Sequence, residues 1–327
     1  MAKRKPKKKA KVRAGKKTGF SVGERALGFA ELGRPVEWSK SLLNMWLAAM
    51  MAYYVFSFTI DFGLFVAGFI SVAALWSALY ALNDYTDRAL DAKHKVKKKR
   101  PIPSGRVSPN QGLAFVIILL AVSFGIAYAL GRFLLGLCLL VMLANQLLYT
   151  VKPFRLKSRK YFDFVSGSMV NPVFRYFSGM VLFVPAGVLF SNFSPLLPLI
   201  FVICMQFSGY SLYRLFSKKD DKKFKMSSSV AKISEEKVKI ASYFALGVAF
   251  LAYLSLLLNG LYYKFLWLGY LPRQFSWAVI LVLLFLPLLK DAILRPGKAS
   301  MGKAYRTIYI ANLVFIAANI VIFVFVP

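Results

Sequence analysis

Acidic residues are scarce in this chain, which has only 13 Asp and Glu against 44 Lys and Arg among its 327 residues. Cysteine and histidine are scarcer still, with two residues and one residue. Cys138 and Cys204 both lie within apolar runs and have no metal-ligand spacing, so we expect them to pack in the interior rather than to bind metal. The first 19 residues lack the apolar core of a signal peptide, and we expect a basic disordered tail there instead.

Long apolar runs dominate the rest of the chain. Hydrophobic residues make up 58% of the sequence and the mean hydropathy is +0.57, which excludes an ordinary soluble domain and predicts an all-α polytopic membrane protein. We predict nine transmembrane helices, near Ser41–Phe58, Gly63–Leu82, Gly112–Leu130, Phe133–Thr150, Tyr161–Val181, Leu196–Phe216, Val238–Leu258, Trp277–Leu289 and Ile308–Phe325.

The distribution of Lys and Arg predicts an orientation. Forty of the 44 cations fall in five regions that alternate across the predicted helices and therefore share one side, namely residues 1–40, 84–111, 152–160, 214–239 and 290–306. Arg132, Lys264 and Arg273 fall on the other side, and Arg175 lies inside a predicted helix. Under the positive-inside rule the N-terminus and these five regions are cytoplasmic.

A net charge of +31 could indicate a nucleic-acid partner. We expect none, because the cations lie in loops next to the membrane rather than on a soluble domain. Anionic lipid headgroups and phosphorylated substrates are the partners that this distribution favours, and the basic tail is expected to attract the chain to the leaflet. The sequence leaves the oligomeric state open.

The most polar segment of the chain is Asn83–Gly105, which reads NDYTDRALDAKHKVKKKRPIPSG. Asp84, Asp87 and Asp91 occupy positions i, i+3 and i+7, and they share one face if the preceding apolar helix continues through them. Carboxylates in this arrangement can share one or two Mg²⁺ ions, which proteins commonly bind together with substrate phosphates. We therefore predict a magnesium and diphosphate site at a membrane interface.

Cations follow this acidic face directly. Lys97 and Arg100 belong to a basic run that can hold the same anion, whereas a solvated helix end that offsets nearby cations is the alternative interpretation. His94, the only histidine, either contacts a phosphate or hydroxyl group or has no role in binding.

The NDYTDRALD segment, followed by RPIPSG, resembles the first Asp-rich motif of the UbiA superfamily of intramembrane prenyltransferases. The resemblance extends over residues 34–327 and implies a single transmembrane domain whose nine helices surround a central cavity, preceded by a basic tail and membrane-surface lead-in over residues 1–33. It further implies Mg²⁺-dependent transfer of a prenyl group from an isoprenyl diphosphate to a lipophilic acceptor, with release of diphosphate.

The same resemblance assigns roles to the residues of the first motif. Asp84, Asp87 and Asp91 would hold Mg²⁺, and they would form the catalytic set together with Asn83 and Arg100.

Residues 149–163, which read YTVKPFRLKSRKYFD, are similar to the tyrosine-then-basic segment that many of these enzymes carry after their fourth span. By this resemblance Lys152, Arg155 and Lys157 would face the diphosphate, and Tyr149 would be a further substrate-binding residue. A cationic loop without a ligand is the alternative for each of them.

Residues 210–229 lie where this family has its second Asp-rich motif. Tyr213 and Asp221 match the pattern, whereas Tyr210 and Ser217 stand where an Asp is usual. The departure leaves open whether one or two metal ions bind. The substrate-binding candidates in this segment are Tyr213, Arg214, Lys218 and Asp221, with Lys219 and Asp220 beside them.

Two alternatives to prenyl transfer remain open. RPVEWSK at residues 34–40, Arg175 before Gly179 and the basic SLYRLFSKK segment are similar to a subgroup that transfers phosphoribose from phosphoribosyl diphosphate to a polyprenyl phosphate. Arg175, an ionisable residue inside a span, is expected either to bind substrate or to make an interhelical hydrogen bond. An ion-coupled transporter or lipid-binding scaffold is the alternative of another class, although transporters place such carboxylates near the bilayer midplane. The acceptor and the prenyl chain length are not determined by these patterns.

Overall fold

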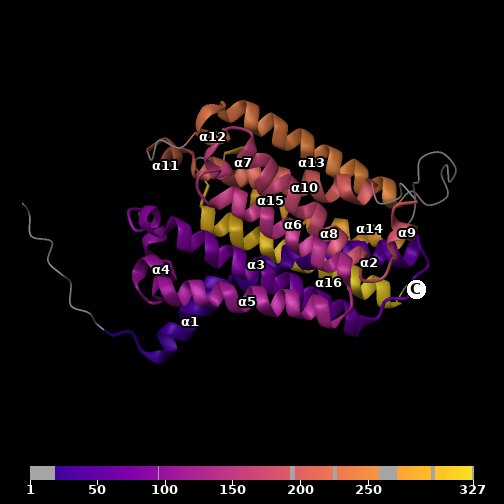
Figure 1. The fold of residues 1–327 in the computed structure, drawn as a ribbon. Helices are drawn as coiled ribbons and strands as arrows, with labels where there is room; N and C mark the ends of the chain where they lie inside the picture. The colour runs from indigo at the N-terminus through magenta and orange to yellow at the C-terminus, as the bar shows by residue number, and fades with distance from the viewer. Residues whose placement is uncertain are drawn as a thin grey trace, which may run out of the picture.

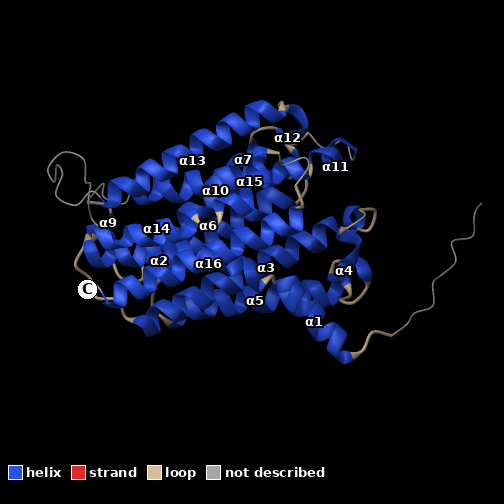
Figure 2. Ribbon diagram, turned by 180° about the vertical axis from the view of Figure 1, so that it is seen from behind, coloured by secondary structure: helices blue, strands red, loops and turns tan. Residues whose placement is uncertain are grey.

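The computed structural model describes residues 19–94, 96–191, 196–223, 227–257, 271–295 and 299–325, except for the side chains of Lys219, Asp220 and Met301. Every regular element in these ranges is a helix and none is a strand, which confirms the predicted all-α class for the described part of the chain (Figure 2). The α-helices are α1 (Val22–Gly33), α2 (Trp38–Tyr54), α3 (Phe62–Asp91), α4 (Pro101–Ser104), α5 (Pro109–Ala129), α6 (Phe133–Thr150), α7 (Phe162–Phe164), α8 (Asn171–Met180), α9 (Ala186–Leu189), α10 (Leu196–Phe216), α11 (Lys218–Lys223), α12 (Ser229–Lys232), α13 (Glu235–Leu257), α14 (Ser276–Leu283), α15 (Leu286–Leu294) and α16 (Met301–Phe325). Single 3-10 turns are η1 (Pro35–Glu37), η2 (Lys97–Lys99), η3 (Leu156–Ser158) and η5 (Arg273–Phe275), and η4 (Val165–Val170) is a π-helix.

The predicted count of nine spans is not confirmed. By length and composition, six helices of the described ranges can cross a membrane, namely α3, α5, α6, α10, α13 and α16. The segments Arg273–Leu283 and Leu286–Leu294 meet at a bend of 63° and make a seventh if they form one broken span. Pro287 lies at the start of the second segment, where its missing backbone donor favours such a break.

Two further predicted spans do not form one long helix in the structure. The first corresponds to α2, which has only 17 residues. The fifth is divided into α7, η4 and α8, because Pro172 cannot donate a backbone hydrogen bond within a continuing helix. The Asn145 amide donates to the Ser166 carbonyl at 2.9 Å and to Asn171 Oδ1 at 2.9 Å, which satisfies groups released by the π-helical turn.

The polar connections gather at one end of the bundle. Figure 1 shows α4, α7, α11 and α12 at the same end, while α9 lies at the opposite end. The described parts of residues 84–111 and 214–239 therefore lie at one end of the bundle, an arrangement compatible with the charge distribution. Ser108 caps α5 by accepting from the Gln111 backbone, so that the chain turns back from this end into the bundle.

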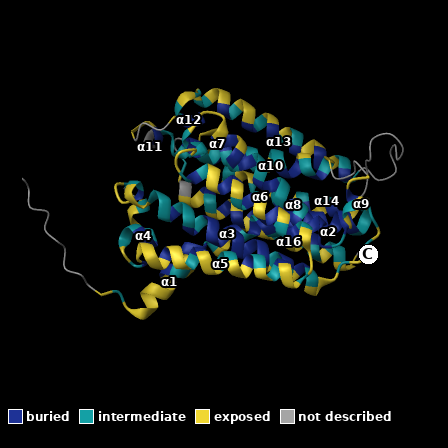
Figure 3. Ribbon diagram, viewed as in Figure 1, coloured by how far each residue is buried: buried dark blue, intermediate teal, exposed yellow. Residues whose placement is uncertain are grey.

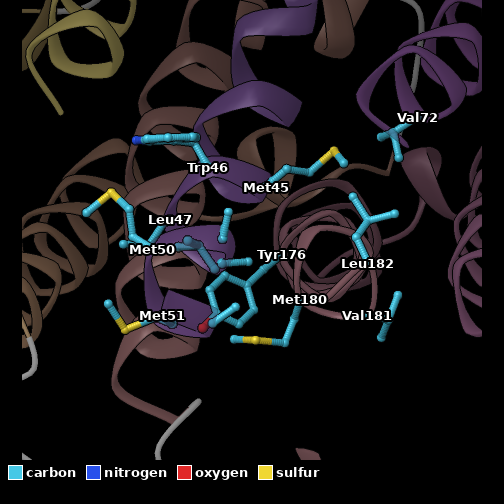
Figure 4. Packing of buried hydrophobic residues seen from close by; sticks show 14 of the residues in the cluster. Met45, Trp46, Leu47, Met50, Met51, Val72, Tyr176, Met180, Val181 and Leu182 are labelled. Carbon is cyan, nitrogen blue, oxygen red and sulfur yellow. The ribbon is translucent and has the colours of Figure 1, made fainter. Parts of the chain in front are cut away.

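The hydrophobic core lies where α2 and α8 meet. Met50 and Met51 of α2 lie beside Tyr176 and Met180 of α8 (Figure 4). A Cβ atom added to Gly179 would lie 2.4 Å from the Met45 carbonyl oxygen, so only glycine permits this close approach of the two backbones. This contact fixes α8 against α2 and thereby positions the polar residues of both helices.

The outer helices expose apolar side chains. α5 and α13 have many exposed residues along their length (Figure 3), including Ile117, Phe244 and Leu251. Exposed aliphatic and aromatic residues on long apolar helices are expected where a helix faces lipid. The polar connections instead lie at one end of the bundle (Figure 1).

Candidate active site

α3 continues as one helix through all three predicted carboxylates and ends at Asp91. Asp84 is 1% exposed, and its Oδ1 accepts from Arg34 Nη2 at 2.6 Å and from Arg100 Nη1 at 2.9 Å. The same Arg100 nitrogen lies 2.8 Å from Asp91 Oδ2. One guanidinium from the loop after α3 therefore bridges two of the three carboxylates.

The third carboxylate, Asp87, faces the loop after α6. Arg155 Nη2 lies 2.8 Å from Asp87 Oδ1, and Lys157 Nζ lies 2.7 Å from Asp87 Oδ2. Lys157 also donates to Asn83 Oδ1 and to Thr150 Oγ1, each at 2.8 Å. We call the group formed by Asn83, Asp84, Asp87, Asp91, Arg34, Arg100, Arg155 and Lys157 the first cluster.

Local backbone structure presents the cations of this cluster. Arg155 has a φ of 40°, and this left-handed residue turns the chain into η3, which carries Lys157. Burial lowers the pKa of Lys157 to about 8, although the attraction of Asp87 opposes the change. Burial and then repulsion by Arg100 also lower the pKa of Lys97. An anion bound beside these lysines would stabilise their charged forms.

A second cluster, formed by Asp163, Arg214, Asp221, Ser228 and Ser229, joins α7, α10, α11 and the start of α12. Arg214 Nη2 lies 2.5 Å from Asp221 Oδ2 and 4.0 Å from Asp163 Oδ2. Ser228 donates to Asp221 at 2.6 Å, and the Ser229 backbone donates to Asp163 at 3.0 Å. The charge of Arg214 is therefore compensated within the protein.

Tyrosines lie between the two clusters. The Tyr149 and Tyr210 hydroxyls are 2.7 Å apart, and the Tyr149 ring centroid lies 6.0 Å from Lys157 Nζ. A Cβ on Gly167 would lie 2.6 Å from the Tyr210 ring, so the π-helical turn η4 supplies the space that this tyrosine fills. Tyr210, which stands where an acid was expected, thus packs against η4 and pairs with Tyr149.

Several predicted residues lie outside these contacts. Lys152 is exposed and makes no ion pair or hydrogen bond with the described residues. Lys218 donates to the Ile233 carbonyl at 3.3 Å, and Tyr213 packs against Tyr305 with ring centroids 6.3 Å apart. The side chains of Lys219 and Asp220 lie outside the described residues. His94 Nδ1 accepts from two backbone amides of its own loop.

Oxygen donors in the first cluster fit Mg²⁺, which prefers carboxylates over nitrogen or sulfur. Asp84 and Asp91 already place one oxygen each within 2.9 Å of a single cationic nitrogen, that of Arg100. No three His, Cys, Asp or Glu side chains of the described residues converge as a ready metal site. A bound metal ion would therefore have to displace Arg100 from at least one carboxylate.

Arg175 lies apart from both clusters, on α8. It is 2% exposed, its guanidinium carbon lies 3.7 Å from the centre of the Trp76 ring, and its Nε has no hydrogen-bond partner within the described residues. Leaving a buried donor unpaired costs about 1–3 kcal/mol. Two roles for Arg175 were predicted from the sequence, a substrate contact and an interhelical hydrogen bond. Either role would give this side chain a hydrogen-bond partner.

Sequence patterns did not predict several of these pairings, nor the contacts of Thr150 and Tyr80. Arg34 pairs with Asp84 across 50 residues, and Asp163 receives the Ser229 backbone across 66 residues. Thr150 was missed although it follows Tyr149 directly. The signal for Tyr80 was available, because it lies one helical turn before Asp84 on the same face of α3.

Comparison with known proteins identifies the kind of fold. The model of the UbiA prenyltransferase family matches residues 42–316. The structure of a UbiA homolog from Archaeoglobus fulgidus bound to GPP and Mg²⁺ has a TM-score of 0.65 and 18% sequence identity, and the match covers 90% of this chain and 99% of that one. The apo structure of a UbiA homolog from Aeropyrum pernix K1 has a TM-score of 0.71 and 19% identity over 88% of this chain and 98% of that one.

Curated relatives carry transferase names. The 4-hydroxybenzoate octaprenyltransferase of Serratia proteamaculans is 28% identical over 76% of this chain and 79% of its own length. The digeranylgeranylglyceryl phosphate synthase of Methanoregula boonei is 32% identical, but the match covers 41% of this chain and less than half, 45%, of that protein.

Proposed function

Because the chain belongs to the UbiA prenyltransferase family, whose model matches residues 42–316, we propose that it transfers a prenyl group from an isoprenyl diphosphate to a lipophilic acceptor within the membrane, with Mg²⁺ and with release of diphosphate. Membership in a prenyltransferase family disfavours the alternative of a transporter or lipid-binding scaffold. The relatives act on hydroxybenzoate and on a glyceryl phosphate, by their names, so the acceptor of this chain needs a separate argument.

One observation carries the proposal. Three carboxylates on the last turns of α3 meet four cations that come from three other segments of the chain, namely Arg34, Arg100, Arg155 and Lys157. A structural ion pair needs only one cation for each carboxylate. The surplus of cations, three of them partly exposed arginines, around this carboxylate face supports a site that exchanges internal pairs for a metal-bound diphosphate.

The residues of the first cluster have separate roles in this proposal. Asp84, Asp87 and Asp91 would hold Mg²⁺, which neutralises the charge of the departing diphosphate when it is bound. Arg100, Arg155 and Lys157 donate to the diphosphate oxygens through charge-assisted hydrogen bonds. Asn83 fixes Lys157, because its Oδ1 already accepts from the ammonium group at 2.8 Å.

In the transfer itself, the bond between C1 of the prenyl chain and the bridging oxygen breaks, and its electron pair leaves with the diphosphate. A carbon or oxygen nucleophile of the acceptor forms the new bond to C1 and loses a proton. The Tyr149 ring borders the first cluster, where an aromatic face stabilises positive charge that develops on C1.

Phosphoribosyl transfer to a polyprenyl phosphate is the second candidate. The basic segment at the end of α10 supports this candidate less than its sequence suggests. Arg214 lies 2.5 Å from Asp221, so its charge is compensated within the second cluster. The buried cation Arg175 still favours an acceptor that carries negative charge. Prenyl transfer therefore stays the first proposal.

We also propose that both clusters and the N-terminus face the cytoplasm, because 40 of the 44 cations lie on the corresponding side. Anionic lipid headgroups would contact the exposed lysines of these loops.

A radiolabel transfer assay in native lipid extract tests the function. Purified protein is incubated in parallel with labelled geranylgeranyl diphosphate and with labelled phosphoribosyl diphosphate plus a polyprenyl phosphate, each with Mg²⁺ or with EDTA. Mg²⁺-dependent label in a prenylated lipid supports the proposal. Consumption of phosphoribosyl diphosphate alone would establish the second candidate instead.

A further inference from the structure

Two buried hydrogen-bond donors without acceptors lie on side chains that touch each other. Arg175 Nε and Trp76 Nε1 both lack a hydrogen-bond partner in the part of the chain that the structure describes, and the guanidinium stacks on the indole ring at 3.7 Å. Arginine and the indole group can only donate. Both side chains are at most 4% exposed, so water at the surface cannot supply the missing acceptors.

Glu37 is the acid whose charge acts on Arg175, and its oxygens are already occupied. Glu37 lies 2.7 Å from Lys40 Nζ and accepts hydrogen bonds from the Tyr305 and Tyr309 hydroxyls. Tyr80 also donates to Glu37, at 3.2 Å. No ion pair to Arg175 occurs among the described residues, so the cation of Arg175 has no carboxylate of its own.

The position of the pair relates it to the first cluster. Trp76, Tyr80 and Asp84 follow one another at i, i+4 and i+8 and therefore line one face of α3. The Tyr80 side chain interacts with Arg175, and it lies beneath the Arg34 guanidinium at 5.1 Å. Trp76 is two turns, about 12 Å, deeper in the bundle than Asp84. The unpaired donors thus lie below the diphosphate site on the same helix face.

We infer that Arg175 and Trp76 form an oxyanion subsite that binds the negatively charged group of the acceptor, either a carboxylate or a phosphate monoester. An oxyanion accepts from both orphan donors and neutralises the guanidinium, which makes no ion pair among the described residues. The ring of Trp76 holds the guanidinium in place before the acceptor binds. This inference rests on the proposed function, because it assigns the substrate class of the same site.

The depth of the subsite favours an acceptor substrate over a lipid headgroup as its occupant. A headgroup of the bilayer lies at the interface, whereas Trp76 is at the middle of the 30-residue helix α3. An acceptor that enters the bundle can carry its anionic group to that depth while its nucleophile lies nearer to Asp84. A purely structural arginine is the competing explanation, and it predicts no ligand at all.

Binding measurements without catalysis test the subsite. Wild-type protein in phosphatidylcholine nanodiscs is titrated in EDTA with decyl phosphate, decanoate and decanol, which differ in the head group and share the chain. The variants are Arg175→Met, which removes the charge, and Trp76→Phe, which removes only the indole donor. Arg106→Met is the control, because Arg106 lies outside both clusters and donates to Glu31 Oε1 at 2.9 Å.

Wild-type protein is expected to bind at least one of the two oxyanions tenfold or more tightly than decanol. Arg175→Met should abolish this preference, Trp76→Phe should reduce it about threefold, and Arg106→Met should retain it. A stronger preference for decyl phosphate than for decanoate identifies a phosphorylated acceptor, and the reverse order identifies a carboxylate acceptor.

Two results would overturn the inference: no preference for either oxyanion in the wild type, or an unchanged preference in Trp76→Phe. The second criterion holds even if Arg175→Met does not fold. Binding of farnesyl diphosphate with Mg²⁺ is measured on the same wild-type sample. Its absence would refute the proposed function while leaving the oxyanion result to stand or fall on its own data.

Discussion

Asp87→Asn separates the role of a carboxylate in chemistry from its role in stability. Asp87 binds Arg155 and Lys157 at 2.8 and 2.7 Å, and in the proposed function it also holds Mg²⁺. Asp61→Asn is the matched control, because Asp61 caps the opposite end of the same helix by accepting from the Leu64 backbone at 3.0 Å. Both variants make the same chemical change on α3.

The structure limits the expected loss of stability. The Asp87 side chain is 13% exposed and its partners Arg155 and Lys157 are 24% and 7% exposed, which lies between a surface ion pair and a fully buried one. Lys157 keeps two other acceptors, Asn83 and Thr150, when the charge of Asp87 is removed. We therefore expect Asp87→Asn to lower the free energy of unfolding by about 2 kcal/mol. Asp61→Asn should cost less than about 1 kcal/mol, since Asn is also a good helix cap.

The expected loss of activity is larger. Removing a metal ligand that also positions two cations should reduce prenyl transfer on the order of a thousandfold, or about 4 kcal/mol of transition-state stabilisation. Transfer of label from geranylgeranyl diphosphate in native lipid extract measures the rate, and the thermal midpoint in the same nanodiscs measures stability. Asp61→Asn should transfer label at the wild-type rate.

Wild-type turnover by Asp87→Asn would refute the assignment of Asp87 to the reaction. So would an equal loss of activity in Asp61→Asn, because it would trace the effect to the helix rather than to the first cluster. Full turnover of the wild type in EDTA would refute the proposed dependence on Mg²⁺.

Three further predictions concern the fold around the site. Lys98→Cys and Lys232→Cys should react with a membrane-impermeant maleimide from the same side, because α4 and α12 lie at one end of the bundle, and labelling from opposite sides would contradict this arrangement (Figure 1). Burial alone would raise the pKa of Glu37, but Lys40 and the hydrogen-bonded tyrosines outweigh burial and lower this pKa from 4.5 to about 2. The ionised Glu37 therefore contributes stability that is complete above pH 4.5 and is lost as the pH falls toward 2. The thermal midpoint of the wild type should therefore fall more steeply between pH 5 and pH 3 than that of Glu37→Gln, and parallel curves would contradict the ion pair. Gly179→Ala should lower the free energy of unfolding by about 3 kcal/mol, because the new Cβ would meet the Met45 backbone. Gly125→Ala is the control and should be neutral or slightly stabilising, because no atom lies within 4 Å of its Cβ position. Equal thermal midpoints for the two variants would show that the close approach of α2 and α8 is unimportant.

The sequence predicted the features that depend on local spacing. Hydropathy gave the all-α membrane class, because apolar runs of this length need helices to satisfy their backbone groups. The i, i+3, i+7 spacing placed Asp84, Asp87 and Asp91 on one helix face, and α3 does extend to Asp91. Family membership followed from the same motif and is confirmed by the match over residues 42–316.

The number of membrane-spanning helices could not be predicted from hydropathy, because hydropathy shows that a run is apolar but not whether it forms one unbroken helix. The run at residues 161–181 is apolar, yet Pro172 and the π-helical turn divide it into three elements. The bend near Pro287 has the same local cause.

Tertiary structure alone decided which charges meet. Arg34 reaches Asp84 from 50 residues away, and Arg155 and Lys157 reach Asp87 only because the loop after α6 folds over the end of α3. A pairing of this kind depends on how helices pack, which no local period encodes. The same holds for Arg175: its sequence shows a charge inside a span, whereas its missing acceptor becomes visible only when its neighbours are in place.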